Sequence, residues 1–237
     1  MYFCALNIVQ MAKNQENNHQ EIGGLDLQGQ FGKTEMFVTE NKKSLLIILG
    51  AIVIMGGLFI GWNLYHKNQD KEAQDQMFKA EQYFEADSLD KALNGDGNFP
   101  GFVKIIDEYS GTKAANLAYY YSGIIYLKKG EFQKAIDNLE SYSSKDEVTS
   151  ATALGAIGDA YSELKNYDKA ADYYKKAADK KLQSFSPIYL MKLGMIYEEL
   201  KKNDKAVEAY KTIKTEYAES QQARSIDEYI ARAEAKL

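Results

Sequence analysis

Proline, cysteine and histidine are scarce in this chain of 237 residues, and each scarcity excludes something. With Cys4 as the only cysteine, no internal disulfide can form, so a disulfide-stapled fold is excluded. The two histidines, His19 and His66, each stand alone, so neither a zinc site nor a histidine-based triad can be assembled. Pro100 and Pro187 are the only prolines, while Ala, Lys, Glu, Tyr and Leu are abundant, which is the composition of a helical array.

An excess of positive charge is also lacking. The net charge of −5 argues against nucleic acid as a partner, because proteins bind nucleic acid through basic surfaces. Asn94, Asp96 and Asn98 alternate as calcium ligands do, but Phe99 and Ile105 stand where a calcium loop needs its glycine and its bidentate glutamate. We interpret this loop as an inter-helix turn. No catalytic constellation is present, and we expect no enzyme activity, metal or cofactor.

One long apolar run divides the chain. Residues 45–65 carry no charge, and about 20 such residues cross a hydrocarbon core roughly 30 Å thick. We therefore expect a transmembrane helix over 44–66. Within it, Gly57 and Gly61 form a G-x-x-x-G pair that lets two membrane helices approach closely, so a homo-oligomer is one prediction.

The orientation of this helix depends on its flanks. Lysines are nearly balanced on the two sides, but the adjacent pair Lys42 and Lys43 favours a cytoplasmic N-terminus, with the long region on the other side. Trp62 and Tyr65 stand at the far end, where amphipathic rings prefer the membrane interface.

Residues 14–30 are rich in Asn, Gln and Gly without periodicity, and we expect a short disordered tail over 1–43. The apolar residues 1–10 are followed at once by Met11, which we expect to be the natural start. N-terminal peptide mass spectrometry that finds Tyr2 or Phe3 in the mature protein would exclude this start.

Three glycines mark an internal repeat. Gly123, Gly158 and Gly194 are separated by 35 and 36 residues. Each has a large residue four positions before it, a tyrosine three after, an alanine twelve after and a large residue sixteen after: Tyr119, Tyr126, Ala135 and Leu139; Leu154, Tyr161, Ala170 and Tyr174; Leu190, Tyr197, Ala206 and Tyr210. This is the tetratricopeptide (TPR) pattern of stacked helical hairpins, with Ser122 in place of the usual Leu.

The repeat predicts an all-α fold, a TPR solenoid behind a single transmembrane helix. Gly and Ala stand where the two helices of a hairpin cross, and Gly130, Asn166 and Asn203 are expected to cap the second helices. The expected segments are a linker and degenerate hairpin over 67–115, TPR 1 over 116–149, TPR 2 over 150–185, TPR 3 over 186–219 and a capping helix over 220–237.

The first helix of each hairpin lines the concave face of such an array. The expected partner-binding residues on this face are Leu117, Tyr120, Ile124, Asp159, Met191 and Met195. Burial of these side chains between helices remains an equal alternative. If exposed, Met and aromatic residues suit adaptable binding of apolar segments. Capture of a C-terminal carboxylate by Lys and Asn is not expected, because the matching positions hold Leu, Ile, Thr and Asp.

A single anchor, a short tail and three to four repeats together resemble the YfgM-like family of bacterial inner-membrane proteins. The stretches from Asp87 to Gly97 and from Gly101 to Thr112 are similar to the variant first repeat of that family. The resemblance implies repeats in the periplasm and a role beside the Sec translocon and a membrane-anchored periplasmic chaperone/isomerase.

Two functions follow as hypotheses. The first is a chaperone-like adaptor that holds unfolded client segments or a partner's helix. The second is a structural scaffold of a cell-envelope assembly that uses the face of Gly57 and Gly61. An enzyme is a distant third, for lack of any site.

Overall fold

The computed structural model describes residues 41–237 of the chain, which divides into two units, 1–61 and 62–237. The described part of the first unit is helical and belongs to α3 (Lys42–Glu85). By length and composition α3 can cross a membrane, and none of its most apolar stretch is buried. The predicted tail up to residue 40 and the predicted start at Met11 lie outside the described residues.

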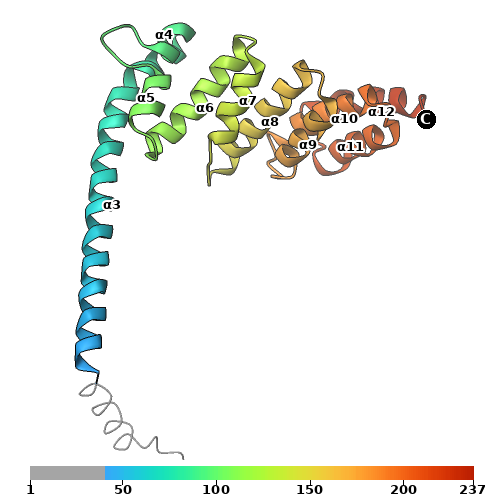
Figure 1. The fold of residues 1–237 in the computed structure, drawn as a ribbon. Helices are drawn as coiled ribbons and strands as arrows, with labels where there is room; N and C mark the ends of the chain where they lie inside the picture. Colours follow the sequence, from blue (N-terminus) through green and yellow to red (C-terminus); the bar gives the residue numbers. More distant parts are fainter. Residues whose placement is uncertain (1–40) are drawn as a thin grey trace, which may run out of the picture. The chain divides into compact units, whose positions relative to one another are not determined.

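The second unit opens with the remainder of α3, followed by α4 (Leu89–Asn94) and α5 (Phe102–Glu108) (Figure 1). Ala73, Met77 and Ala80 recur at helical spacing on α3 and are buried against these helices and α6. Residues 67–85, where a linker was expected to begin, are therefore helical.

The loop between α4 and α5 is organised by Asp96. Its Oδ1 accepts the backbone N–H groups of Asn98 (2.9 Å) and Phe99 (2.8 Å), and its Oδ2 accepts the hydroxyl of Tyr83 (2.6 Å). The hydrogen bond from Tyr83 and those from the backbone lower the pKa of Asp96 to about 2. Asp96 acts as a turn residue here, as the sequence indicated.

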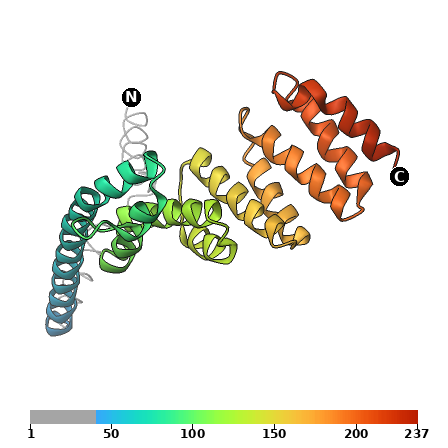
Figure 2. The same ribbon diagram turned by 90° about the horizontal axis from the view of Figure 1, so that it is seen from above.

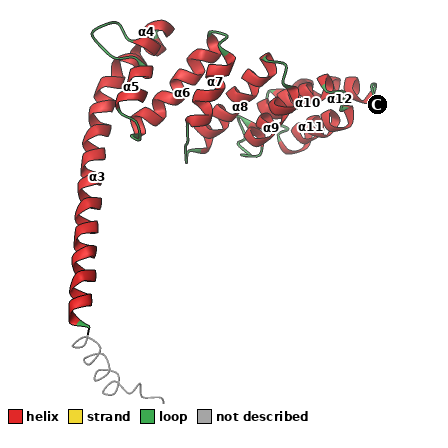
Figure 3. Ribbon diagram, in the orientation of Figure 1, coloured by secondary structure: helices red, strands yellow, loops and turns green. Residues whose placement is uncertain are grey.

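Three helical hairpins follow, and every regular element of residues 41–237 is a helix (Figure 3). The hairpins are α6 (Lys113–Lys128) with α7 (Phe132–Ser141), α8 (Glu147–Glu163) with α9 (Tyr167–Ala178), and α10 (Ser186–Glu199) with α11 (Asn203–Glu216). Figure 2 shows each hairpin beside the next. The unit closes with the 3₁₀ turn Gln222–Ser225 and α12 (Ile226–Glu234).

The repeat glycines do what the motif predicted. A Cβ on Gly123 would lie 2.5 Å from Cγ of Leu139, and one on Gly158 would lie 2.7 Å from the ring of Tyr174. Gly194 faces Tyr210 in the same way. In each hairpin, the side chain sixteen residues after the glycine therefore occupies the space that a larger residue would need.

Of the three residues predicted to cap the second helices, only one is an N-cap in the structure. Asn166 caps α9, its side chain accepting the N–H of Lys169 (3.4 Å). Gly130 instead adopts φ +76° at the turn before α7, and Glu131 is the N-cap. Asn203 is already helical, and its side-chain amide donates to the carbonyl of Lys236 (2.9 Å). Gly130 therefore allows the chain to reverse before α7. Asn203 binds the C-terminal segment, and neither residue caps its helix.

Candidate partner-binding groove

The six predicted binding residues all lie on the first helices of the hairpins. Leu117, Tyr120 and Ile124 are on α6, Asp159 is on α8, and Met191 and Met195 are on α10. None of the six is buried, and Met195 keeps 40 % of its surface exposed. We call the surface that these residues form the groove face.

The apolar members of the groove face pack on different parts of the core. Tyr120 and Ile124 pack against the central cluster, which extends from α7 of the first hairpin to α10 of the third. Leu117 packs against the cluster of α3, α5 and α6, and Met191 against the C-terminal cluster. The structure therefore places Tyr120 and Ile124 together and separates them from Met191.

An ion pair joins the second and third hairpins across the groove face. Lys192 donates to both carboxylate oxygens of Asp159, at 2.6 and 2.9 Å. The hydroxyl of Tyr174 donates to the same carboxylate at 2.6 Å. Burial, followed by the charge of Asp159, raises the pKa of Tyr174 far above its usual value, so its proton stays on the hydroxyl. Asp159 is thus neutralised by its neighbours.

A second, larger network closes the array at Glu198 of α10. Its carboxylate accepts from Arg232 (2.5 Å), Lys236 (2.8 Å) and the hydroxyl of Tyr210 (2.9 Å). Burial raises the pKa of Glu198, but the hydrogen bonds from Arg232, Lys236 and Tyr210 outweigh it and lower the pKa to about 2. Only 9 % of this side chain is exposed, so Glu198 fixes the capping segment and adds little charge to the groove face.

Three residues of the groove were missed from the sequence. The ring of Tyr142, in the α7–α8 loop, lies 5.2 Å from that of Tyr120. Tyr189 of α10 covers Gly155 of α8, so Gly155 offers no open surface. Lys192, the partner of Asp159, is the third. Tyr142 lies in a loop and has no equivalent in the other repeats, so the repeat pattern could not reveal it. Tyr189 and Lys192 lie close before Gly194, and a search for aromatic and basic residues near each motif glycine could have found them.

Gly57 and Gly61, the predicted helix-packing pair, lie in the first unit. Both are exposed, and a Cβ built on either meets no atom within 4 Å. Their surface is free for another helix to approach.

No group of His, Cys, Asp and Glu side chains that could hold a metal ion occurs within residues 41–237. Burial and the charge of Asp159 raise the pKa of Tyr174, whereas hydrogen bonds from Arg232, Lys236 and Tyr210 lower the pKa of Glu198. Both shifts keep the ordinary protonation state, which suits structural roles rather than proton transfer.

The tetratricopeptide repeat-like domain family matches residues 36–230, and the chain belongs to this family. Two crystal structures of a candidate kinesin light chain from Podosopora anserina with nearly identical TPR-like repeats, one of them a single-residue variant, are similar to it. Each is 14 % identical, covers 70 % of this chain and 87 % of its own, and gives a TM-score of 0.53, which shows the shared fold. A search of curated proteins gives no match.

The all-α fold, a TPR solenoid with one long apolar N-terminal helix, is thus confirmed. The protein is a TPR-type repeat protein, a class whose typical role is protein–protein interaction without catalysis.

Proposed function

We propose that this protein is a membrane-tethered adaptor with a chaperone-like role. It is anchored in a bacterial inner membrane by α3, with a cytoplasmic N-terminus and periplasmic repeats. Its groove face holds apolar segments of translocated and envelope proteins, in partnership with the Sec translocon and a periplasmic chaperone/isomerase. The resemblance to the YfgM-like family supports this placement.

The observation that carries the proposal is the apolar, partly open surface of α6. Four side chains on this helix are half-buried: Leu117, Tyr120, Ile124 and Leu127. None of them makes a side-chain hydrogen bond within the described part of the chain. Half-exposed aliphatic and aromatic side chains that line one helix face suit an extended apolar segment. Met195 adds a flexible, exposed contact at the far end.

In-cell crosslinking tests the partners. A photo-crosslinking residue is placed at position 120 or 195, and at position 133 on the exposed surface of α7 as a control. We expect translocon subunits, an isomerase or nascent envelope proteins to be captured from 120 and 195 and not from 133. Capture of cytosolic proteins alone would refute the proposed orientation.

Peptide binding tests the groove. The full chain, in detergent, is titrated with a fluorescein-labelled unstructured peptide rich in Leu and Phe. Tyr120→Asp and Met195→Asp should each weaken binding, while Gln133→Asp should not. Unchanged affinity in both groove variants would remove the groove from the proposal.

The open surface at Gly57 and Gly61 favours a second candidate, a scaffold subunit that assembles through its membrane helix. Its mark would be an oligomer that survives the groove substitutions but is lost in Gly57→Leu.

A further inference from the structure

A cavity lies beside the part of α3 that opens the second unit. It has a volume of about 390 Å³ and is lined by Asn63, His66, Lys67 and Asp70 of α3 and by residues 111–113 before and at the start of α6. This volume is within the range of ordinary ligand pockets, roughly 300–1,000 Å³. The N–H of Ala114 donates to Oδ1 of Asp70 at 2.9 Å and holds the two walls together.

The charge of this cavity is positive. Lys67 and Lys113 line it, and neither makes an ion pair with any residue of the described part of the chain. Asp70 is the only acid in the lining, and both of its oxygens are occupied, by the N–H of Ala114 and by the amide of Gln74 (3.1 Å). Two unpaired cations and one satisfied carboxylate leave a net attraction for an anion.

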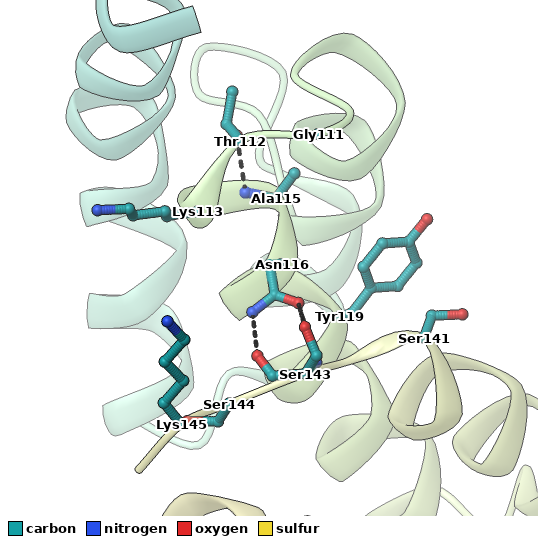
Figure 4. A pocket seen from close by; sticks show the side chains of 10 residues that line it. All are labelled: Gly111, Thr112, Lys113, Ala115, Asn116, Tyr119, Ser141, Ser143, Ser144 and Lys145. Atoms are coloured by element: carbon teal, nitrogen blue, oxygen red, sulfur yellow. Dashed lines mark hydrogen bonds between the residues drawn. The ribbon is translucent and has the colours of Figure 1, made fainter. Parts of the chain in front are cut away.

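A second cavity, of about 680 Å³, adjoins the first at Lys113. Figure 4 shows Lys113 and Lys145 on the same side of this cavity. Asn116 holds the segment before α8 by accepting the N–H of Ser143 (3.0 Å) and donating to its carbonyl (2.8 Å). The hydroxyls of Ser143 and Ser144 add hydrogen-bonding groups beside the two lysines.

The position of the first cavity along α3 indicates where an anion would come from. Trp62, Leu64 and Tyr65 are exposed at the end of the apolar run. At about 1.5 Å per residue, Asp70 lies roughly 7 Å beyond Tyr65 along the helix. The headgroup layer on one side of a bilayer is about 5–7 Å thick. If Tyr65 lies at the edge of the hydrocarbon, the cavity opens among lipid headgroups.

We propose that the cavity of Lys67 and Lys113 binds the phosphate of an anionic phospholipid headgroup. The two ammonium groups supply the charge, and the side-chain amide of Asn63 supplies a further hydrogen-bond donor. The proposal rests on the membrane anchor of the proposed function and is independent of the groove face.

Another cavity of the same unit provides a matched control. It has a volume of about 330 Å³ and lies among α9, α10 and α11. It also contains two lysines, Lys175 and Lys205, but these are balanced by Asp179 and Glu208. Equal numbers of cations and acids give it no net attraction for phosphate.

The test uses the fluorescence of Trp62, the only tryptophan of the chain, whose ring lies 4.6 Å from that of His66. The full chain is reconstituted in vesicles of phosphatidylcholine and phosphatidylglycerol. A quenching doxyl group is attached near the top of the acyl chain of one lipid or the other, at equal mole fraction. We expect roughly fivefold stronger association of the labelled phosphatidylglycerol, from charge contributions of this order for juxtamembrane lysines.

The preference should fall to near one in the Lys67→Gln/Lys113→Gln variant and persist in Lys175→Gln/Lys205→Gln, which loses the same charge. Equal quenching by both lipids in the unmodified protein would overturn the proposal. So would a preference that persists in Lys67→Gln/Lys113→Gln while circular dichroism shows unchanged helicity.

Two further outcomes separate the possible sources of phosphate and the two proposals. If inorganic phosphate quenches or shifts Trp62 emission to the same extent with and without phosphatidylglycerol, and abolishes the lipid preference at about millimolar concentration and constant ionic strength, free phosphate binds more tightly than the headgroup and the lipid assignment is wrong. If no labelled lipid quenches Trp62, the membrane anchor fails, and the headgroup site fails with it. Loss of peptide binding at the groove face would leave the lipid preference unchanged.

Discussion

The helices of all three hairpins cross at a glycine, but the side chain packed over that glycine differs between the first hairpin and the two that follow. Over Gly123 lies the aliphatic Leu139, while over Gly158 and Gly194 lie Tyr174 and Tyr210. Each of these tyrosine hydroxyls donates to an acid of the first helix, at Asp159 and at Glu198.

The positions that carry the acids explain the contrast. Asp159 follows its glycine by one residue and Glu198 follows its glycine by four. The corresponding residues of the first repeat are Ile124 and Leu127, which have no charge to offer a tyrosine. The first hairpin therefore keeps an apolar surface, whereas Asp159 pairs with Lys192 of the next repeat and Glu198 pairs with Arg232 of the capping helix. This difference divides the groove face into an apolar half and a self-neutralised half.

The largest expected effect is at the crossing itself. Gly158→Ala would place a methyl group 2.7 Å from the Tyr174 ring, which the hydrogen bond to Asp159 holds in place. We expect a loss of about 3 kcal/mol, because overpacking typically costs 1–3 kcal/mol and this ring cannot easily move. Gly123→Ala should cost less, about 1–2 kcal/mol, because no hydrogen bond tethers Leu139. Thermal unfolding followed by circular dichroism measures both, and equal losses would contradict the proposed role of the tether.

The next effect concerns the network at Glu198. Its pKa is lowered from 4.5 to about 2 in the folded protein. The stabilisation is therefore fully present above pH 4.5 and is lost as the pH falls from there through 2. The difference corresponds to roughly 3 kcal/mol, since one pKa unit is about 1.4 kcal/mol.

The matching variant is Glu198→Gln, which should lose about 2 kcal/mol at pH 7 and lose less stability than the unmodified protein between pH 4.5 and 2. Glu199→Gln is the control, because Glu199 is exposed and makes none of these contacts. Unfolding by urea at several pH values measures both. If the two variants show the same pH dependence, the stability does not depend on the Glu198 network.

A smaller effect tests whether the apolar half of the groove face dominates binding. Ile124→Thr should weaken binding of the Leu- and Phe-rich peptide about tenfold, which is about 1.4 kcal/mol. Met195→Gln should weaken it only about twofold, because Met195 is on the same helix as Lys192 and near its ion pair. Fluorescence anisotropy gives both affinities. A stronger effect at Met195 would reverse the division of the groove face.

Most of the fold could be predicted from the sequence, because a few residues at fixed spacing specify it. The glycines at 123, 158 and 194 and their partners sixteen residues later identified every hairpin crossing correctly. Two of the three caps were wrong, since Gly and Asn suit several positions at a helix end. The candidate site was harder to predict. The residues of the groove face could be named from the motif, but the pairs Asp159–Lys192 and Glu198–Arg232 depend on how successive repeats stack.

The smallest expected effect is at Ser122, where the first repeat departs from the other two. Ile157 and Leu193 fill the equivalent positions and are buried. Ser122 is fully buried, and its hydroxyl has no hydrogen-bond partner. Ser122→Ala should therefore stabilise the protein by about 1 kcal/mol, from loss of an unsatisfied hydroxyl and a gain in helix propensity. Ser141→Ala, at an exposed hydroxyl that donates to the carbonyl of Asp137 (2.8 Å), should change the stability little.

The restored motif residue provides the complementary test. On the side of α6 that faces α5, the ring of Phe102 stacks on that of Tyr121 at 4.9 Å, so the opening helices already fill space beside the first repeat. Ser122→Leu should then destabilise the protein by about 1–3 kcal/mol, although Leu is the usual residue of the motif. Stabilisation by Leu would mean that the first repeat lacks volume rather than a hydrogen-bond partner. Opposite effects of Ala and Leu would show that the serine accommodates the packing of α5 on α6.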